Sequence, residues 1–207
     1  MKLQLALDRL TKEECFLMVE ETLPCVDWIE IGTGVIKEYG MDIVREMKLR
    51  YPDVVLVADM KTCDAGQFEA RQAFDAGADI MTVMAFSHDK TIEDALSVAA
   101  EHNGQIMIDM LQVEGNGRLE ELESLGAMLF ALHIGKDGQA AGKHIKFQKE
   151  LQQFTNPNLK FALAGGITAS SIPTLKGKDF DVLIIGSAIT ASDNPKKAAK
   201  EIRNLMK

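Results

Sequence analysis

Residues 54–59 read Val-Val-Leu-Val-Ala-Asp, a run of branched apolar side chains that closes on a carboxylate. Branched residues favour extended backbone, and a continuous apolar run indicates a strand buried on both faces. Residues 67–76 follow with the apolar spacing of a helix. Together these segments predict one strand followed by one helix, with charged groups where the strand ends.

The same unit repeats along the chain. Further strands are predicted at residues 3–8, 28–32, 79–84, 105–110, 128–133, 160–164 and 182–186. Helical spacing or capping signals follow at residues 11–23, 35–49, 91–102, 118–125, 143–153, 170–175 and 195–206. Eight strand–helix units without an intervening linker predict an α/β fold, in which residues 1–207 form a single (β/α)8 barrel, the TIM barrel.

A doubly wound parallel sheet is the competing architecture. Such sheets often carry a glycine-rich phosphate loop after the first strand, but residues 8–11 read Asp-Arg-Leu-Thr. Gly32 and Gly34 begin a similar pattern later, yet Lys37 stands where the third glycine is needed. The barrel is therefore the favoured interpretation.

Charge and composition exclude several partners. The chain has 31 acidic and 23 basic residues, a net charge of −8, so we expect no binding to nucleic acid or to an anionic membrane. No apolar segment is long enough for a membrane span. Three cysteines without metal-ligand spacing fit neither a disulfide framework nor a zinc site, so a cytoplasmic location is expected.

Charged side chains close several of the predicted strands. They are Asp8, Glu30, Asp59 with Lys61, Asp109 and His133. Charges are costly inside a parallel sheet, and in such barrels the chemistry is carried where strands end. We therefore expect these side chains to meet at the mouth of the barrel. For any single carboxylate, a helix cap remains an alternative, above all for Asp64, which stands just before a predicted helix.

Glu30 and Asp59 indicate a metal site. Two adjacent carboxylates repel each other unless a cation lies between them, and hard oxygen ligands suit Mg²⁺ better than Zn²⁺. His133 closes a strongly apolar run and is a candidate general acid or base, although a buried structural histidine is the alternative.

The last two strands end without charge. Gly165-Gly166 and Gly186-Ser187 follow them. Glycines let backbone N–H groups approach a ligand, and barrels often bind phosphate after strands seven and eight. The residues alone thus predict an enzyme that holds a phosphorylated small molecule and stabilises an enediolate, though tight turns are the alternative for the glycines.

Residues 58–66, Ala-Asp-Met-Lys-Thr-Cys-Asp-Ala-Gly, resemble the DxKxxD signature of the orotidine 5′-monophosphate decarboxylase suprafamily. Within it, the chain is most similar to the 3-hexulose-6-phosphate synthase family. The similarity extends through residues 3–8, 29–33, 75–79, 133–139 and 164–167.

The resemblance implies an aldehyde-lyase that joins D-ribulose 5-phosphate to formaldehyde, with Mg²⁺ as cofactor and D-arabino-hex-3-ulose 6-phosphate as product. It further implies a homodimer in which Asp64 enters the partner's site. The implied roles are metal binding by Glu30 and Asp59, anion stabilisation by Lys61 beside Asp8, proton transfer by His133, substrate hydroxyl contact by Asp109, and phosphate binding by Gly166, Gly186 and Ser187.

Two alternatives remain open. The related 3-keto-L-gulonate-6-phosphate decarboxylases typically have arginines where this chain has Lys136 and Ser187, which favours the synthase, although Lys136 keeps a positive charge. A non-catalytic sugar-phosphate sensor is the second alternative, but it would not need a proton-transferring histidine.

Overall fold

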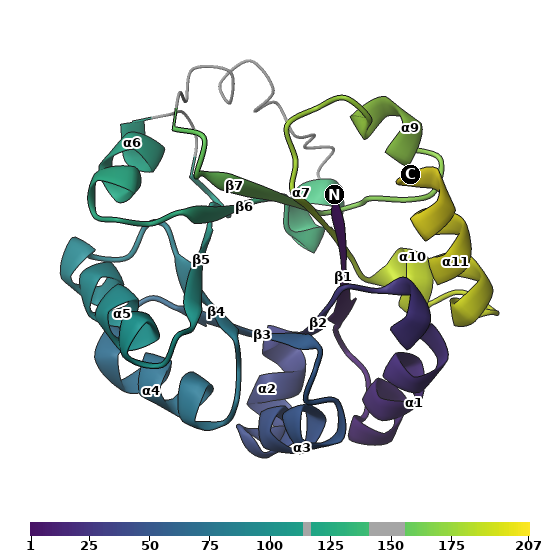
Figure 1. Ribbon diagram of the computed structural model, residues 1–207, viewed down its shortest axis with the longest axis horizontal. Coiled ribbons are helices and arrows are strands. Elements are labelled where there is room, and N and C mark those ends of the chain that lie inside the picture. Colours follow the sequence, from purple (N-terminus) through teal and green to yellow (C-terminus); the bar gives the residue numbers. More distant parts are fainter. Residues whose placement is uncertain (114–116, 141–155) are drawn as a thin grey trace.

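A computed structural model describes residues 1–113, 117–140 and 156–207. Eight parallel strands close into a barrel in sequence order, as Figure 1 shows. The strands are β1 (Lys2–Leu7), β2 (Trp28–Ile31), β3 (Val55–Thr62), β4 (Ile80–Met84), β5 (Gln105–Asp109), β6 (Leu129–His133), β7 (Lys160–Ala164) and β8 (Val182–Ile185). The predicted (β/α)8 barrel is confirmed, and the doubly wound sheet is excluded because β1 pairs with β8.

Helices surround the barrel (Figure 1). They are α1 (Lys12–Thr22), α2 (Thr33–Tyr39), α3 (Asp42–Arg50), α4 (Gly66–Asp75), α5 (Asp89–Glu101), α6 (Gly117–Ser124), α7 (Lys136–Ala140), α9 (Ile172–Leu175), α10 (Ser187–Thr190) and α11 (Pro195–Leu205), with a 3₁₀ turn, η1 (Leu23–Cys25). At α1, where the sequence predicts a helix over residues 11–23, Thr11 and Glu14 form a capping box. The helix predicted at residues 143–153 lies outside the described residues.

Two features of the helices differ from prediction. The single helix expected over residues 35–49 is two, α2 and α3, because Gly40 ends α2 in the left-handed region with φ 64°. The short helices α7 and α10 were not predicted, since four or five residues are too few to show helical spacing.

The barrel separates two apolar cores. Side chains on the outer face of the strands pack beneath the helices, and Leu5, Ile29 and Phe130 are among them. A smaller core fills the barrel itself, formed by Val57, Ile80, Met107, Leu129, Ala131, Ala162 and Val182. Successive strand residues point to opposite faces, so each strand contributes to both cores.

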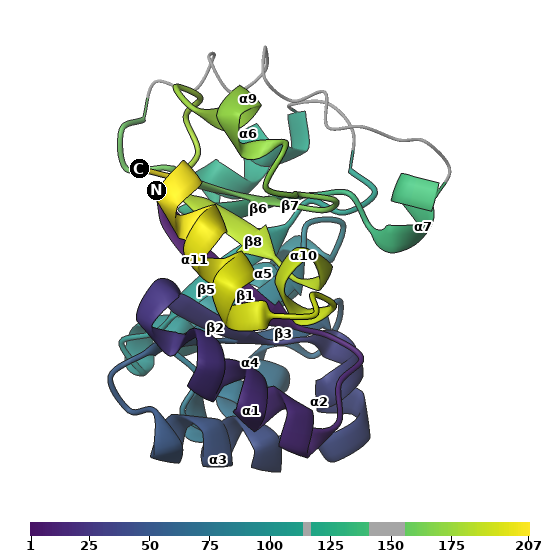
Figure 2. The same cartoon turned by 90° about the vertical axis from the view of Figure 1, so that its right-hand side faces the viewer.

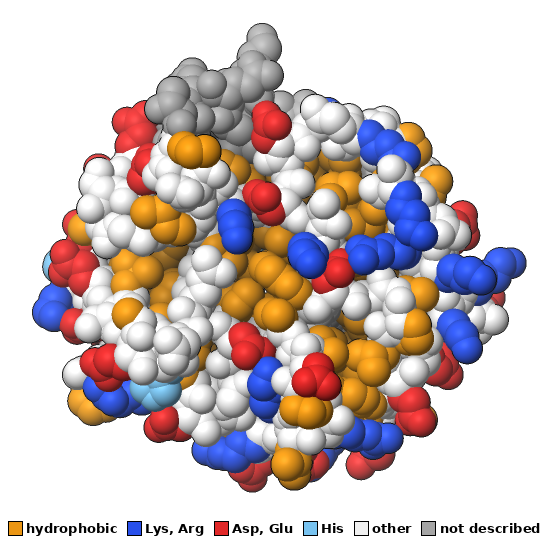
Figure 3. All heavy atoms as spheres, viewed as in Figure 1, with side chains coloured by type: hydrophobic (Ala, Val, Ile, Leu, Met, Phe, Trp, Pro, Cys, Tyr) orange, Lys and Arg blue, Asp and Glu red, His pale blue; other side chains and the backbone are white. Residues whose placement is uncertain are grey.

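The two ends of the barrel differ in chemistry. Both chain termini lie at one end, whereas α7 and α10 lie at the other (Figure 2). The end that carries the termini faces the viewer in Figure 3, with hydrophobic side chains gathered at its centre. None of the helices in the described ranges is both long and apolar enough to cross a membrane.

Candidate active site

A pocket of about 640 Å³ opens at the carboxyl end of the strands. This is within the size range of small-molecule sites. Nine of the ten predicted site residues line it: Asp8, Glu30, Asp59, Lys61, Asp109, His133, Gly166, Gly186 and Ser187. The structure therefore brings together side chains from strands that are far apart in the sequence.

Lys61 lies between two carboxylates. Its Nζ atom is 3.0 Å from the carboxylate of Asp59 and 2.8 Å from Oδ2 of Asp109. Burial acts to lower the pKa of Lys61, but the charges of Asp59 and Asp109 outweigh it and raise the pKa above its ordinary value. Lys61 is therefore a fixed cation in the pocket.

The backbone at Lys61 is unusual for a strand. Lys61 has φ 49°, and the β3–β4 pairing shifts its register between Ala58 and Thr62. The backbone N–H of Lys61 donates to Thr82 Oγ1 at 2.9 Å. Left-handed backbone is uncommon for a side chain of this size and is often found where function requires it. The irregularity extends β3 beyond its predicted end at Asp59.

Asp59 is held from several sides. Thr33 Oγ1 donates to its Oδ2 at 2.7 Å, and Thr82 Oγ1 donates to its Oδ1 at 2.8 Å. With Lys61, this gives both carboxylate oxygens a partner. The carboxylate is therefore fixed in orientation, as suits a metal ligand.

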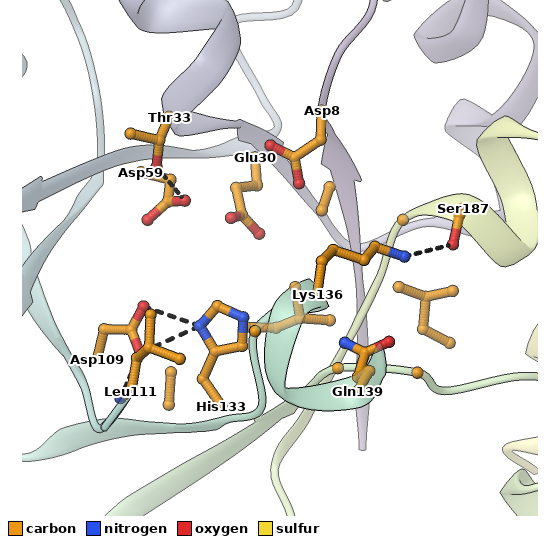
Figure 4. Close-up of a pocket in the computed structure, with 18 of the residues that line it drawn as sticks. Asp8, Glu30, Thr33, Asp59, Asp109, Leu111, His133, Lys136, Gln139 and Ser187 are labelled. Atoms are coloured by element: carbon orange, nitrogen blue, oxygen red, sulfur yellow. Dashed lines mark hydrogen bonds and ion pairs between the residues drawn. The ribbon is translucent and has the colours of Figure 1, made fainter. Parts of the chain in front are cut away.

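His133 and Asp109 form a pair across the pocket from Asp59 (Figure 4). His133 Nδ1 is 3.0 Å from Asp109 Oδ2 and 3.2 Å from Oδ1. Burial of Asp109 acts to raise its pKa, but the hydrogen bond and charge of His133, with Lys61, lower it to about 2. An ionised Asp109 accepts a hydrogen bond from the Nδ1–H group, which leaves the lone pair of Nε2 of the neutral His133 ring available to a substrate.

Glu30 and Asp8 lie beside Asp59 (Figure 4). Glu30 is 7% exposed, and its Oε2 accepts a hydrogen bond from Gln4 Nε2 at 2.6 Å. Burial first, and then the charges of Asp59 and Asp8, raise the pKa of Glu30 to about 8. Partial burial and the charge of Asp59 also raise the pKa of Asp8.

Gly32 provides the space for Asp8. A Cβ atom at position 32 would lie 2.0 Å from Asp8 Oδ1 and 2.7 Å from the carbonyl oxygen of Leu7. Such distances are far below van der Waals contact. Asp8 can hold its position only because residue 32 has no side chain.

The carboxylates fit a hard divalent cation. Burial first, and then the charges of Asp59 and Asp8, raise the pKa of Glu30, and a cation bound beside its carboxylate would act in the opposite direction. Among the described residues, no three or more His, Cys, Asp or Glu side chains are arranged to hold a metal ion. The protein would thus supply one or two ligands, as is usual for Mg²⁺, with water and substrate completing the set.

The opposite rim of the pocket is built from backbone and hydroxyl groups. Gly165 and Gly166 have φ 108° and 67°, and a Cβ at Gly165 would lie 2.3 Å from the carbonyl oxygen of Ile134. Lys136 Nζ donates to Ser187 Oγ at 3.1 Å (Figure 4). This rim offers a cation, a hydroxyl group and close backbone, which suits an anionic group.

Asp64 is the predicted site residue that the structure does not bring into the pocket. It is exposed and does not line the cavity. The alternative that it caps α4 is wrong, because Ala65 is the cap residue, with φ 52° and no side-chain hydrogen bond. The side chain of Asp64 therefore does not cap the N-terminus of α4.

Several residues that line the pocket or support its carboxylates escaped the sequence interpretation. Gln4, Thr33 and Thr82 orient the carboxylates, and Gln139 donates to the Ile134 carbonyl at 2.7 Å. Gln4 and Thr82 share a signal that could have found them: each is a polar residue within an apolar strand. Thr33 and Gln139 lie in helices, where such residues are ordinary.

Comparison with known proteins places this geometry in a family. The family model described as "Orotidine 5'-phosphate decarboxylase / HUMPS family" matches residues 1–202. The chain is 36% identical to 3-hexulose-6-phosphate synthase of Mycobacterium gastri over 204 residues, 98% of each chain. It is 35% identical to the Bacillus subtilis enzyme of that name over 207 residues, 100% of this chain and 99% of the relative.

Solved structures agree. The 3-hexulose-6-phosphate synthase of Salmonella typhimurium has a TM-score of 0.95 and 35% identity, covering 100% of this chain and 98% of that one. The 3-keto-L-gulonate-6-phosphate decarboxylase of Vibrio cholerae has a TM-score of 0.88 and 28% identity, covering 99% and 96%. The resemblance drawn from the motifs is confirmed, as is the prediction of an enzyme: the chain belongs to the orotidine 5′-phosphate decarboxylase/HUMPS family.

Proposed function

We propose that the chain is a 3-hexulose-6-phosphate synthase, which condenses D-ribulose 5-phosphate with formaldehyde to D-arabino-hex-3-ulose 6-phosphate in a reversible, Mg²⁺-dependent reaction. Full-length similarity to synthases from two organisms supports the assignment. The observation that carries the chemistry is the pairing of His133 with Asp109 beside Lys61.

The pair supplies a proton-transfer group. With Nδ1 bonded to Asp109, Nε2 of His133 takes the proton from C1 of ribulose 5-phosphate, and the electron pair forms an enediolate. C1 of the enediolate then forms a bond to the carbon of formaldehyde, the C=O π bond breaks, and the oxygen receives the proton held by His133, which returns the ring to its neutral form. Lys61 stabilises the negative charge on the substrate during both steps, and Asp109 is also close enough to Lys61 to keep it in place.

Glu30 and Asp59 would hold Mg²⁺, and their oxygen ligands and fixed orientation support this assignment. When bound, the metal ion supplies positive charge that stabilises negative charge on substrate oxygens. Asp8, at the edge of the same corner, contributes a further carboxylate beside Lys61.

The glycine rim would hold the phosphate. Backbone N–H groups at Gly166, Gly186 and Ser187 are available where a side chain would block approach, and Lys136 adds a positive charge. An acidic chain can thus bind an anionic substrate by local groups despite its net charge of −8.

The proposal includes a cytoplasmic homodimer in which Asp64 completes the partner's site. Asp64 is exposed rather than turned into its own pocket, and Phe68, in the first turn of α4, is 70% exposed. An exposed aromatic side chain four residues after Asp64 is compatible with a surface that a second chain covers.

A decarboxylase acting on 3-keto-L-gulonate 6-phosphate is the second candidate. Lys136 keeps this candidate open, because it retains a positive charge where the related decarboxylases typically have an arginine. The lower identity to the Vibrio cholerae decarboxylase, 28% against 35% for the Salmonella synthase, favours the aldol reaction.

One experiment separates the candidates. Purified protein is incubated either with ribulose 5-phosphate and formaldehyde or with 3-keto-L-gulonate 6-phosphate, each with and without Mg²⁺. We expect faster turnover of the first pair, and only with the metal. Faster release of CO₂ from the gulonate would assign the decarboxylase, and no turnover of either would favour the sensor.

A further inference from the structure

Gln4 is a polar side chain in the interior of the barrel. It is 0% exposed and belongs to β1, a strand whose other central residues are apolar. In the β1–β2 pairing, Gln4 lies opposite Trp28, and Ala6 lies opposite Glu30. Gln4 and Glu30 therefore lie in successive inward-facing layers of the barrel, with Gln4 nearer the end that carries the chain termini.

The amide of Gln4 contacts one group in particular. Its Nε2 donates to Glu30 Oε2 at 2.6 Å. Within the described ranges, this is the one hydrogen bond that the Glu30 side chain makes to the protein, whereas Asp59 is held by Thr33, Thr82 and Lys61. Loss of Gln4 would remove the one hydrogen bond that orients Glu30. Loss of any one neighbour of Asp59 would leave two others in place.

The other end of the same amide is not satisfied. Gln4 Oε1 is buried and has no hydrogen-bond partner among the described residues. A buried carbonyl oxygen without a partner destabilises the folded state, and an apolar side chain of similar size would avoid this cost. The cost of this oxygen offsets the stability gained from the one hydrogen bond that the amide makes to Glu30, so folding stability alone does not explain an amide here.

We propose that Gln4 is a positioning residue that aims the carboxylate of Glu30 at the metal site. This inference rests on the proposed function, since it requires that Glu30 binds Mg²⁺. The amide costs stability and provides orientation, so its removal should separate metal binding from folding. Residues that orient a ligand from behind commonly have this effect on metal affinity.

The test is calorimetric titration of Mg²⁺ into the wild-type protein and into Gln4→Met, without substrate. Methionine has a similar length and shape but no N–H donor. We expect the dissociation constant for Mg²⁺ to rise by roughly 10- to 100-fold, and the melting temperature without metal to stay equal or increase. The Mg²⁺ concentration needed for half-maximal activity should shift by the same factor.

Ile80→Val is the matched control. Ile80 lies in the barrel core, and its apolar side chain cannot hydrogen-bond to the carboxylates, so its truncation should lower the melting temperature without changing the Mg²⁺ affinity. A purely structural role for Gln4 predicts this same result for Gln4→Met.

Each outcome is decisive. Unchanged Mg²⁺ affinity in Gln4→Met, with tight binding by the wild type, overturns the role of Gln4 and leaves the proposed function intact. Absence of Mg²⁺ binding by the wild type overturns both. If Gln4→Met does not fold, Gln4→Leu is measured instead, and failure of both to fold overturns the inference because it assigns the amide to folding.

Discussion

His133 Nδ1 lies 3.0 Å from Oδ2 of Asp109, in a pair that joins the ends of β5 and β6. The hydrogen bond fixes both the ring orientation and the nitrogen that carries the proton. It thereby leaves one basic nitrogen for the substrate.

Replacement of His133 by asparagine should slow exchange of the C1 proton of ribulose 5-phosphate with deuterated solvent by roughly 10²- to 10⁴-fold, the usual contribution of a positioned base. Nuclear magnetic resonance measures the exchange without formaldehyde. Binding of ribulose 5-phosphate to the same variant is the control and should barely change. Wild-type exchange in a folded variant would assign the base to another residue.

Asp109 should stabilise the fold above its ordinary pKa. Its pKa is lowered from 3.8 to about 2 in the folded protein, so this stabilisation is lost as the pH falls through that range. The wild type should lose on the order of 2 kcal/mol more than Asp109→Asn between about pH 4 and pH 2. Urea unfolding at several pH values measures the difference. Equal losses in the two proteins would contradict the lowered pKa.

Glu30→Gln should remove the response to Mg²⁺ without harming the fold. The pKa of Glu30 is raised by burial, so at pH 8 the ionised carboxylate disfavours the folded state and a neutral amide should be tolerated. EDTA should abolish wild-type activity and Mg²⁺ restore it. Thermal melts should show a Mg²⁺-dependent increase for the wild type and none for the variant. Full activity in metal-free wild type would refute the metal requirement.

Mixed dimers test the position of Asp64. Asp64→Ala and Lys61→Ala should each be inactive, but random exchange of subunits should restore up to about a quarter of wild-type activity, because one site in each hybrid dimer has both native residues. Activity is measured after mixing, with exchange verified by native mass spectrometry. No recovery among verified hybrids would place both residues in one chain.

The cysteines should differ in reactivity. Cys63 is exposed, whereas Cys15 is a buried residue of α1, and burial followed by the charge of Glu14 raises the pKa of Cys15 to about 12. A thiol reagent should therefore modify Cys63 rapidly and Cys15 only after unfolding. Peptide mass spectrometry after brief labelling distinguishes them. Rapid labelling of Cys15 in the native protein would mean that α1 opens readily.

The strands were predictable because each is a short apolar run, and several of these runs close on a charged residue. The convergence of Glu30, Asp59 and His133 followed from one property of parallel barrels, that all strand ends meet at one mouth. The break at Gly40 was missed because helical spacing continues across it, and only the left-handed backbone shows that the helix ends.

The supporting contacts were not predictable from periodicity. Gln4 meets Glu30 through the strand register, and Thr82 meets Asp59 through the shift in β3, which the sequence does not reveal. Asp64 was open to interpretation as a helix cap because aspartate favours that role, but the left-handed Ala65 takes the position. The preference of aspartate for the N-cap position is thus overridden by the backbone conformation of the loop before α4.

Because Asp8 occupies the space where a side chain at position 32 would lie, the site tolerates substitution of Gly32 as poorly as substitution of its charged residues. An alanine there would displace Asp8 while every acid, base and cation of the pocket remained in the sequence. A homologue with this substitution would be classified as active if only the catalytic and metal-binding residues were compared. Selection for catalysis must therefore act on a residue that touches no substrate.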